Sequence, residues 1–390
     1  MGIVGIGVKL MTSTRFVCFL LILFFPQICL SEVFPDFKFK TQKHNVLVKK
    51  LVGNLDHPWG LAFLPNDLFL VSERSGKLKL IMPDLSQKLV HGLPDVWDHG
   101  QGGLLDVVTD PNFSQNQIIY FSFSEPSSDN RRAGTAVASA KLILEKKPVL
   151  KNMRVIFTQN IKSSSSVHFG SRIVISPNRK LFITIGDRGD GDRAQNPFDH
   201  AGSVLRINTN GSSPSSNPFF GSKKALPEIW SIGHRNPQGA IWNTVTESLW
   251  TLSHGAKGGD EINQPLAGKN YGWPIISYGR HYWGAKIGVG THKSGLQQPI
   301  YYWDPSIAPS GFAIYSGDVF SKWAGNLFVG ALKYELISRL ELKNGEIVSE
   351  ERLFPNRFGR IRDIRVGPKG YLYFLTDETD GGLYKISSLD

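Results

Sequence analysis

Cysteine is almost absent from this chain, and the two cysteines that it has lie near the N-terminus. Cys18 and Cys29 both fall in or beside an apolar run from Phe16 to Ile28 that follows two basic residues. A short apolar run of this kind, followed by small residues, is typical of a secretory signal peptide and is too short for a stable membrane span. We therefore predict a cleaved signal peptide over residues 1–31 and a periplasmic or secreted mature protein. Without cysteine, that mature protein has no disulfide framework.

Long hydrophobic runs and clustered charges are also lacking after residue 31, so no membrane span is expected in the mature protein. The formal net charge is +11, or +9 once Lys9 and Arg15 leave with the signal peptide, yet no run holds five or more positive residues. Scattered charge without a nucleic-acid motif predicts a solvated basic surface and no nucleic-acid partner. The sequence also has no Walker motif, zinc-ligand cluster or nucleophile elbow.

What the chain does have is one pattern repeated six times: a small or polar lead-in, an alternating apolar strand, a turn and a second apolar strand. The copies lie at residues 57–73, 101–125, 168–187, 236–255, 310–332 and 360–378. Pro65 in the first turn and Pro368 in the last are 303 residues apart, which gives a mean spacing of about 61 residues. Period-two alternation with such turns indicates β-hairpins.

Six sheet-forming repeats in one chain must protect their edge strands, and radial closure does this economically. The sequence therefore predicts an all-β fold, a six-bladed β-propeller with four-stranded antiparallel blades. It would form a single domain over residues 40–386. A β-sandwich or two smaller barrels is the alternative.

In a propeller the lead-in loops of all blades converge on the central channel. The lead-ins carry a candidate base, amides and several cations, which is more chemistry than a stable blade requires. They supply Trp59, Gln101, His168, Arg235, Asn236, Gly311, Arg360 and Arg362.

His168 and Asp187 stand at the two ends of the third hairpin. Antiparallel strands joined by a tight turn return the chain to the same end, so we expect the two side chains to lie close together. A carboxylate that holds one imidazole nitrogen fixes the tautomer and leaves the other nitrogen as a proton acceptor. The alternative is that Asp187 caps its glycine-rich turn.

Cations gather at the starts of the later repeats. Arg235 directly precedes the fourth repeat, Lys333 follows the fifth, and Arg360 and Arg362 flank Ile361 in the sixth. Residues two apart in a strand point to the same side. If these cations converge on the channel, they predict a multiply anionic ligand.

Residues 253–274, SHGAKGGDEINQPLAGKNYGWP, form the most unusual segment. Glycines free the backbone to expose carbonyl groups, and Asp260 and Glu261 supply carboxylates. Hard oxygen ligands on a flexible loop suit Ca²⁺ better than zinc. An ordinary acidic turn is an equal alternative.

Eight blocks in order from about residue 50 to the C-terminus carry a family resemblance. They read HPWGLAFLP, GQGGLLDV, HFGSR, PEIWSIGHRNPQG, HGAKGGDEIN, GKNYGWP, FVGALK and RIRDIRVGPKGYLYFLTDE. Together they resemble the soluble aldose sugar dehydrogenases of the glucose/sorbosone dehydrogenase group, which depend on pyrroloquinoline quinone (PQQ).

The resemblance implies a propeller that oxidises an aldose sugar at C1 to a lactone, with PQQ and Ca²⁺ as cofactors. It makes His168 the base, Asp187 its orienting partner, and Arg235 the cation beside the developing negative charge. The electron acceptor is not identified, and the protein would be a monomer or homodimer. The cofactor positions implied are Gln101, Arg235, Asn236, Tyr282, Ala331, Lys333, Arg360 and Arg362. The resemblance also implies two calcium positions: main-chain oxygens of Gly255 and Ala256 hold the ion beside the quinone, and Glu261 and Tyr271 mark a second, structural ion.

One departure and two alternatives remain. Ala256 stands where the family commonly has proline, which a main-chain carbonyl ligand tolerates with some loss of loop rigidity. A non-catalytic secreted propeller that binds a protein or glycan is one alternative. A metal-dependent lactonase-type hydrolase is the other.

Overall fold

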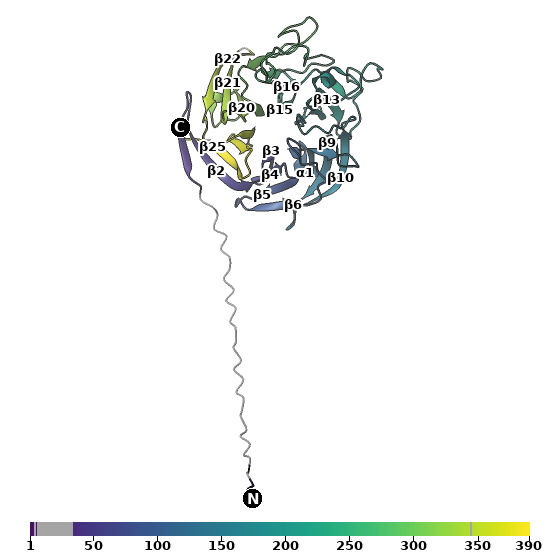
Figure 1. Cartoon of the computed structure of the whole chain (residues 1–390). Helices are drawn as coiled ribbons and strands as arrows, with labels where there is room; N and C mark the ends of the chain where they lie inside the picture. The colour runs from purple at the N-terminus through teal and green to yellow at the C-terminus, as the bar shows by residue number, and fades with distance from the viewer. Residues whose placement is uncertain (4, 6–33, 344) are drawn as a thin grey trace. The chain divides into compact units, whose positions relative to one another are not determined.

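The computed structural model describes residues 1–3, 5, 34–343 and 345–390. The predicted signal peptide therefore lies almost wholly outside the described residues. Residues 34–390 form one compact unit in which six sheets stand around a common centre (Figure 1). The prediction of a six-bladed all-β propeller is confirmed.

Blades 1 to 5 are consecutive four-stranded antiparallel sheets, and each predicted hairpin supplies the two inner strands of a blade. Blade 1 contains β3 (Pro58–Leu64), β4 (Leu68–Glu73), β5 (Lys77–Ile81) and β6 (Gln87–Val90). Blade 2 contains β7 (Leu104–Thr109), β8 (Ile118–Pro126), β9 (Ala133–Ile143) and β10 (Val149–Thr158). Blade 3 contains β11 (Ile173–Ile175), β12 (Lys180–Thr184), β13 (Ser203–Asn208) and β14 (Ile229–Ile232). Blade 4 contains β15 (Pro237–Asn243), β16 (Ser248–Ser253), β17 (Asp260–Asn263) and β18 (Tyr301–Trp303). Blade 5 contains β19 (Pro309–Ile314), β20 (Leu327–Ala331), β21 (Leu336–Lys343) and β22 (Glu346–Leu353).

Blade 6 closes the ring with strands from both ends of the chain. It contains β23 (Ile361–Val366), β24 (Leu372–Thr376), β25 (Gly381–Ser388), β2 (Asn45–Leu55) and β1 (Asp36–Lys40). The N-terminal β2 pairs with the C-terminal β25, so the outer part of this blade is built from residues more than 300 positions apart. The fifth strand, β1, was not predicted, and the propeller extends from Asp36 to Ser388, slightly beyond residues 40–386.

Helical structure is short where the chain is described. One α-helical turn, α1 (Phe113–Asn116), links β7 to β8, and two 3₁₀ turns, η1 (Gly191–Gln195) and η2 (Ser321–Trp323), lie in loops of blades 3 and 5. None of the helices in the described part of the chain has the length and hydrophobicity needed to cross a membrane.

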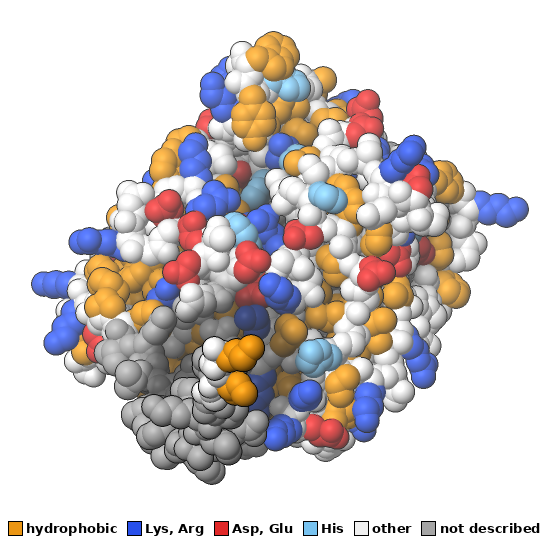
Figure 2. All heavy atoms as spheres, turned by 60° about the horizontal axis from the view of Figure 1, so that its bottom comes forward, with side chains coloured by type: hydrophobic (Ala, Val, Ile, Leu, Met, Phe, Trp, Pro, Cys, Tyr) orange, Lys and Arg blue, Asp and Glu red, His pale blue; other side chains and the backbone are white. Residues whose placement is uncertain are grey.

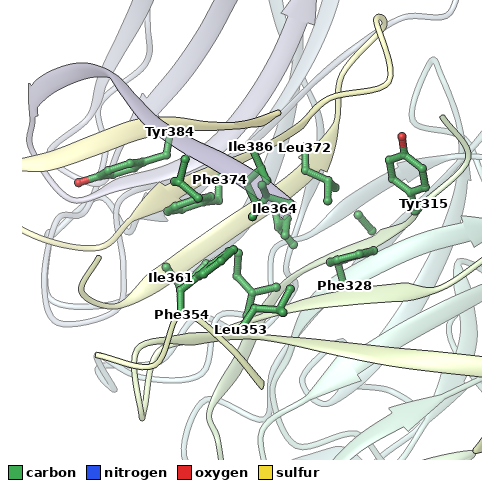
Figure 3. Packing of buried hydrophobic residues seen from close by; sticks show 14 of the residues in the cluster. Tyr315, Phe328, Leu353, Phe354, Ile361, Ile364, Leu372, Phe374, Tyr384 and Ile386 are labelled. Carbon is green, nitrogen blue, oxygen red and sulfur yellow. The ribbon is translucent and has the colours of Figure 1, made fainter. Parts of the chain in front are cut away.

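The core lies between neighbouring blades, where alternate residues of each strand face the next sheet. Between blades 5 and 6 it is strongly aromatic (Figure 3). Phe328 and Phe374 are fully buried, and Phe374 stacks on Tyr384 with ring centroids 4.7 Å apart. Val46 and Val48 of β2 are also fully buried in this cluster, so the closing strand is part of the core.

The outer surface carries charge of both signs. On the face shown in Figure 2, Lys and Arg side chains are interspersed with Asp and Glu rather than gathered in one patch. This agrees with the scattered positive charge of the sequence.

Candidate active site

His168 and Asp187 meet at the channel end of blade 3. His168 precedes β11 and Asp187 follows β12, and these strands pair antiparallel. The hairpin thus brings the imidazole Nδ1 to 2.6 Å from the carboxylate Oδ1. The expected proximity is found, whereas the catalytic roles remain predictions.

Asp187 is held as a carboxylate by donors on both oxygens. Besides His168, the main-chain N–H of Gly189 donates to Oδ1 at 2.7 Å, and the indole Nε1 of Trp273 donates to Oδ2 at 2.8 Å. Burial raises the pKa of Asp187, but the hydrogen bond from His168 and the nearby charges of His168 and Arg235 outweigh it and hold the pKa below its usual value. An ionised Asp187 fixes a proton on Nδ1 of His168 and leaves Nε2 to accept one.

The loop that carries His168 has an unusual backbone. His168 has φ of +55°, a left-handed conformation that non-glycine residues rarely adopt. Its main-chain N–H donates to Oε1 of Gln101 at 2.8 Å, and the N–H of Gly170 donates to Oδ1 of Asn236 at 3.1 Å. A Cβ at position 186 would clash with the carbonyl group of His168, which explains Gly186. Gln101 and Asn236, predicted to hold a cofactor, thus also hold this loop.

A cavity of about 420 Å³, the dyad cavity, opens beside the pair. Its lining includes His168, Asp187, Arg235, Ala256, Trp273 and Tyr282. Tyr282 stands at the rim with 72 % of its surface exposed. The guanidinium group of Arg235 lies 5.2 Å from the centre of the Trp273 ring and donates to the carbonyl oxygens of His254 and Gly255.

A second cavity of about 240 Å³, the arginine cavity, is lined by residues from blades 1, 2, 4, 5 and 6. Its lining includes Trp59, Arg74, Gln101, Gln238, His254, Arg360, Arg362 and Asp377. Gln101 belongs to this lining and accepts a hydrogen bond from the N–H of His168, which lines the dyad cavity, so the linings of the two cavities are in direct contact. The lead-ins of blades 1, 2, 4 and 6 therefore converge as the repeat pattern predicted.

Three arginines share one carboxylate in the arginine cavity. Asp377 accepts a hydrogen bond from Arg362, and its carboxylate lies 3.8 Å from Arg360 and 4.0 Å from Arg74. Burial raises the pKa of Asp377, but the charge and hydrogen bond of Arg362 and the charge of Arg74 more than reverse this, so the pKa is strongly lowered. One negative charge against three positive charges leaves a cationic cavity.

Buried donors in this region lack partners among the described residues. They are Nε of Arg74, Nε of Arg362 and Nδ2 of Asn236. A buried N–H without an acceptor is costly, so such groups usually serve a ligand or water. Together with the surplus cations they fit an anionic ligand that carries several oxygens, as a tricarboxylate quinone does.

The calcium positions do not behave alike. Glu261 and Tyr271 both line a narrow third cavity, and burial raises the pKa of Glu261 to about 7. A buried carboxylate of this kind fits a cation partner. The hydroxyl of Tyr271, however, donates to the carbonyl oxygen of Gln264 and accepts from the N–H of Leu266, so only its main chain is free to bind metal.

The structure corrects the reading of Asp260 as a metal carboxylate. Its Oδ1 accepts from the N–H of Gly255 at 2.8 Å, and its Oδ2 accepts from Ser306, Ile307 and Ala308. The side chain is fully buried and fastens the loop instead. Where the chain is described, no three His, Cys, Asp or Glu side chains gather for a metal. A calcium ion at Gly255 and Ala256 would therefore depend on main-chain oxygens, whereas one at Glu261 could also use the carboxylate of that residue.

Three of the predicted cofactor positions, Asn236, Ala331 and Lys333, line none of the three cavities described above. Lys333 is exposed, with Nζ 4.9 Å from the centre of the Tyr334 ring, and the side chain of Ala331 is fully buried in the core between blades. Leu332, between them, lines the arginine cavity. Ala331 can therefore meet a cofactor only through its main chain, and Lys333 would have to swing inward.

Sequence reasoning missed Arg74, His254, Asp377 and Trp273. The first three each follow directly after the second strand of a repeat, so the chain returns them to the channel as it does Asp187. Burial and the charge of Arg235 lower the pKa of His254 to about 3, which keeps this imidazole neutral. The end of the second strand was thus a usable signal, whereas nothing in the sequence placed the indole of Trp273 on Asp187.

These features define a class of protein: a six-bladed propeller whose channel sets a carboxylate-oriented histidine beside a cationic ligand cavity. Comparison with known proteins specifies it further. The glucose/sorbosone dehydrogenase family matches residues 55–385. The chain therefore belongs to this family, and the predicted resemblance and enzyme class are confirmed.

The chain is 42 % identical over 367 residues to the aldose sugar dehydrogenase YliI of Escherichia coli, with 93 % of this chain and 97 % of the relative covered. The crystal structure of the soluble aldose sugar dehydrogenase of E. coli in its apo form superposes with a TM-score of 0.85 at 42 % identity, covering 88 % of this chain and 99 % of that one. The PQQ-bound aldose sugar dehydrogenase of Streptomyces coelicolor superposes with a TM-score of 0.72 at 25 % identity, covering 88 % and 98 %.

Proposed function

We propose that this protein is an exported, PQQ- and Ca²⁺-dependent dehydrogenase that oxidises aldose sugars at C1 to lactones. The observation that carries the proposal is the His168–Asp187 pair, 2.6 Å apart, in a cavity that adjoins the three-arginine cavity. Neither feature is required to stabilise a propeller. The PQQ-bound state of the S. coelicolor relative supports the choice of cofactor.

The arginine cavity would hold the carboxylates of PQQ. Arg362 is 5 % exposed and is oriented by Oε1 of Gln238 at 2.8 Å, while Arg74 is oriented by the carbonyl oxygen of Gly100 at 2.8 Å. Planar guanidinium groups pair well with carboxylates, so a tricarboxylate would satisfy donors that Asp377 leaves unmatched. When bound, PQQ would accept the hydride from C1 of the sugar.

His168 performs the proton chemistry. With Nδ1–H bonded to Asp187, Nε2 accepts the proton of the anomeric hydroxyl, while C1 loses its hydrogen as a hydride. The electron pair of the O–H bond becomes the second bond of the lactone carbonyl group. Asp187 stabilises the imidazolium so formed, and Arg235, at the wall of the same cavity, stabilises developing negative charge nearby.

Main-chain oxygens around Gly255 and Ala256 would bind the calcium ion beside the cofactor, and Glu261 with the main chain of Tyr271 would bind a second, structural calcium ion. Because the carbonyl oxygen of Gly255 accepts from Arg235, a cation there would share this oxygen with the guanidinium group. Export rests on the signal peptide predicted over residues 1–31, and N-terminal sequencing of the secreted protein would locate the cleavage site.

The test is reconstitution of purified apo-protein. With PQQ and CaCl₂ present, we expect dye reduction on addition of glucose and a rise in melting temperature that depends on PQQ. His168→Ala should keep the melting shift but not the dye reduction. Absence of both signals from the wild-type protein would overturn the proposal and favour a non-catalytic binding propeller.

A further inference from the structure

Arg188 is a buried cation directly after Asp187. Its side chain is 1 % exposed, and in the described part of the chain no carboxylate lies within 4 Å of its guanidinium group. Burial, reinforced by the charge of Arg193, lowers its pKa to about 9, although Asp187 partly opposes this. Burying an arginine without an acidic partner is expensive, so the position calls for a physical reason.

The guanidinium group contacts three residues close to His168 in the chain, at positions 165, 167 and 169. Its two terminal nitrogens donate to the carbonyl oxygens of Ser165 and Val167. Its plane lies over the ring of Phe169, with Cζ 3.3 Å from the ring centroid. Arg188 thus holds both the approach to His168 and the residue after it.

This loop needs such support because its conformation is intrinsically unfavourable. His168, Gly170 and Ser171 all have positive φ, and two of the three are not glycine. Left-handed conformations persist in L-residues only where surrounding contacts enforce them. Gln101 contributes from the other side, through the hydrogen bond between its Oε1 and the N–H of His168 and through its own N–H to the carbonyl oxygen of Ser166.

We propose that Arg188 is a positioning residue for the His168 base, acting by locking residues 165–169 in the conformation that keeps Nδ1 on Asp187 and Nε2 toward the dyad cavity. This inference rests on the proposed function for its catalytic part. Its structural part, the locked loop, is independent of any cofactor. Arg188 touches neither the predicted base nor the predicted metal positions, and apart from its chain neighbour Asp187 its side chain contacts the site through the loop.

The experiment compares Arg188→Met and Arg188→Lys with the control Arg206→Met. Arg206 is also a buried arginine of blade 3 that lies over an aromatic ring, 4.4 Å from the centre of Trp230, and bonds to the neutral Asn217. Its removal therefore imposes a similar loss of packing and hydrogen bonding away from His168. Hydrogen exchange of the apo-proteins reports the loop, and steady-state kinetics of the reconstituted proteins report the base.

We expect Arg188→Met to speed amide exchange in residues 163–171 and to lower kcat by about 10- to 100-fold, with KM for glucose within about threefold. Arg188→Lys, which retains charge but not the planar fork, should recover part of both losses. Arg206→Met should lower the melting temperature comparably without changing exchange in 163–171 or kcat.

Equal loss of kcat in Arg188→Met and Arg206→Met, or faster loop exchange with unchanged kcat, would overturn the proposal. If Arg188→Met does not fold, Arg188→Lys alone tests the proposal. Its amide exchange in residues 163–171 must be faster than that of the wild type, and its kcat must be lower. If the wild-type protein oxidises no sugar, the proposed function fails. The exchange data then still show whether Arg188 locks the loop.

Discussion

Asp187→Asn is the sharpest perturbation of the candidate site, because it changes one oxygen to nitrogen and almost nothing in shape. Asp187 receives three donors: Nδ1 of His168, the N–H of Gly189 and Nε1 of Trp273. An amide offers only one acceptor oxygen. In one orientation its NH₂ group faces the Trp273 indole, and in the other it faces His168 and Gly189. Either way a donor meets a donor in a buried site.

The second orientation is the one that stops catalysis. An NH₂ group facing Nδ1 makes that nitrogen an acceptor and moves the ring proton to Nε2, which then cannot take a proton from the sugar. The first orientation keeps the tautomer but removes the negative charge that stabilises the imidazolium. We therefore expect kcat to fall by about 10²- to 10⁴-fold, or about 3–5 kcal/mol of barrier, with KM little changed. Loss of the charge-assisted hydrogen bonds should cost about 1–3 kcal/mol of folding stability.

The assay is dye-linked glucose oxidation by reconstituted protein, paired with urea unfolding of the apo-protein. Asp110→Asn is the matched control, since Asp110 is a buried aspartate of blade 2 that also accepts several hydrogen bonds, including one from Arg179. Its loss should reduce stability but leave kcat within about twofold. A kcat for Asp187→Asn within threefold of wild type, or an equal fall in Asp110→Asn, would refute the reasoning.

The pH dependence of folding stability provides a second test of the role of the Asp187 carboxylate. The folded-state pKa of Asp187 is below its usual value, so the carboxylate stabilises the folded protein above about pH 4 and this contribution disappears as the pH falls through the lower value. The stability difference between wild type and Asp187→Asn should therefore be largest near pH 7 and shrink below about pH 4. A difference that grows on acidification would contradict this sign.

Three further predictions concern neighbouring parts of the site. His168→Ala should lower kcat by at least about 10³-fold while the PQQ-dependent melting shift persists, as dye reduction and thermal unfolding will show. Asp377→Asn should lower the free energy of unfolding at pH 7 by about 3–5 kcal/mol, because Arg362 loses its buried partner. Since the pKa of Asp377 is lowered in the folded protein, the wild type loses the stabilisation by this carboxylate as the pH falls from about 5 to 2. Urea titrations of Asp377→Asn should therefore show a smaller loss of stability over that pH range. Dialysis against a chelator should remove activity that Ca²⁺ restores and Mg²⁺ does not, because oxygens on an irregular loop suit the larger ion.

The repeat pattern predicted the propeller because its information is local. Period-two alternation, a turn and a second apolar strand define each inner hairpin without reference to the rest of the chain. Closure of the ring is different. The strand β2 has the alternation of any half-buried strand, and only its pairing with β25 at the opposite end of the chain assigns it to blade 6. The outermost strand β1 reads DFKFK, and its alternation of Phe37 and Phe39 with polar residues is too short to predict a strand without its partner β2.

The candidate site shows the same difference between features set by local sequence and features set by long-range contacts. His168 and Asp187 were predictable because one hairpin delivers both, and the lead-in residues because blade geometry delivers them. Side-chain direction was not predictable. Asp260 has a carboxylate suited to calcium, but four hydrogen-bond donors, one from Gly255 and three from residues 306–308, occupy its two oxygens. The sequence does not show these contacts, because they form only when the loop from Ser306 to Ala308 folds against Asp260.

Several of the bonds that orient the candidate catalytic groups cross from one blade to another. Gln101, before blade 2, accepts from His168 of blade 3, and the N–H of Asp187 donates to the carbonyl oxygen of Arg235 before blade 4. Arg362 of blade 6 is oriented by Gln238 of blade 4. A small relative rotation of two blades would therefore misplace the base against the cationic cavity without breaking any single sheet. The strand β2 lies at the outer side of blade 6 and lines none of the three channel cavities described above. Because such bonds connect blades 2, 3, 4 and 6 at the channel, the active geometry nevertheless depends on ring closure by β2.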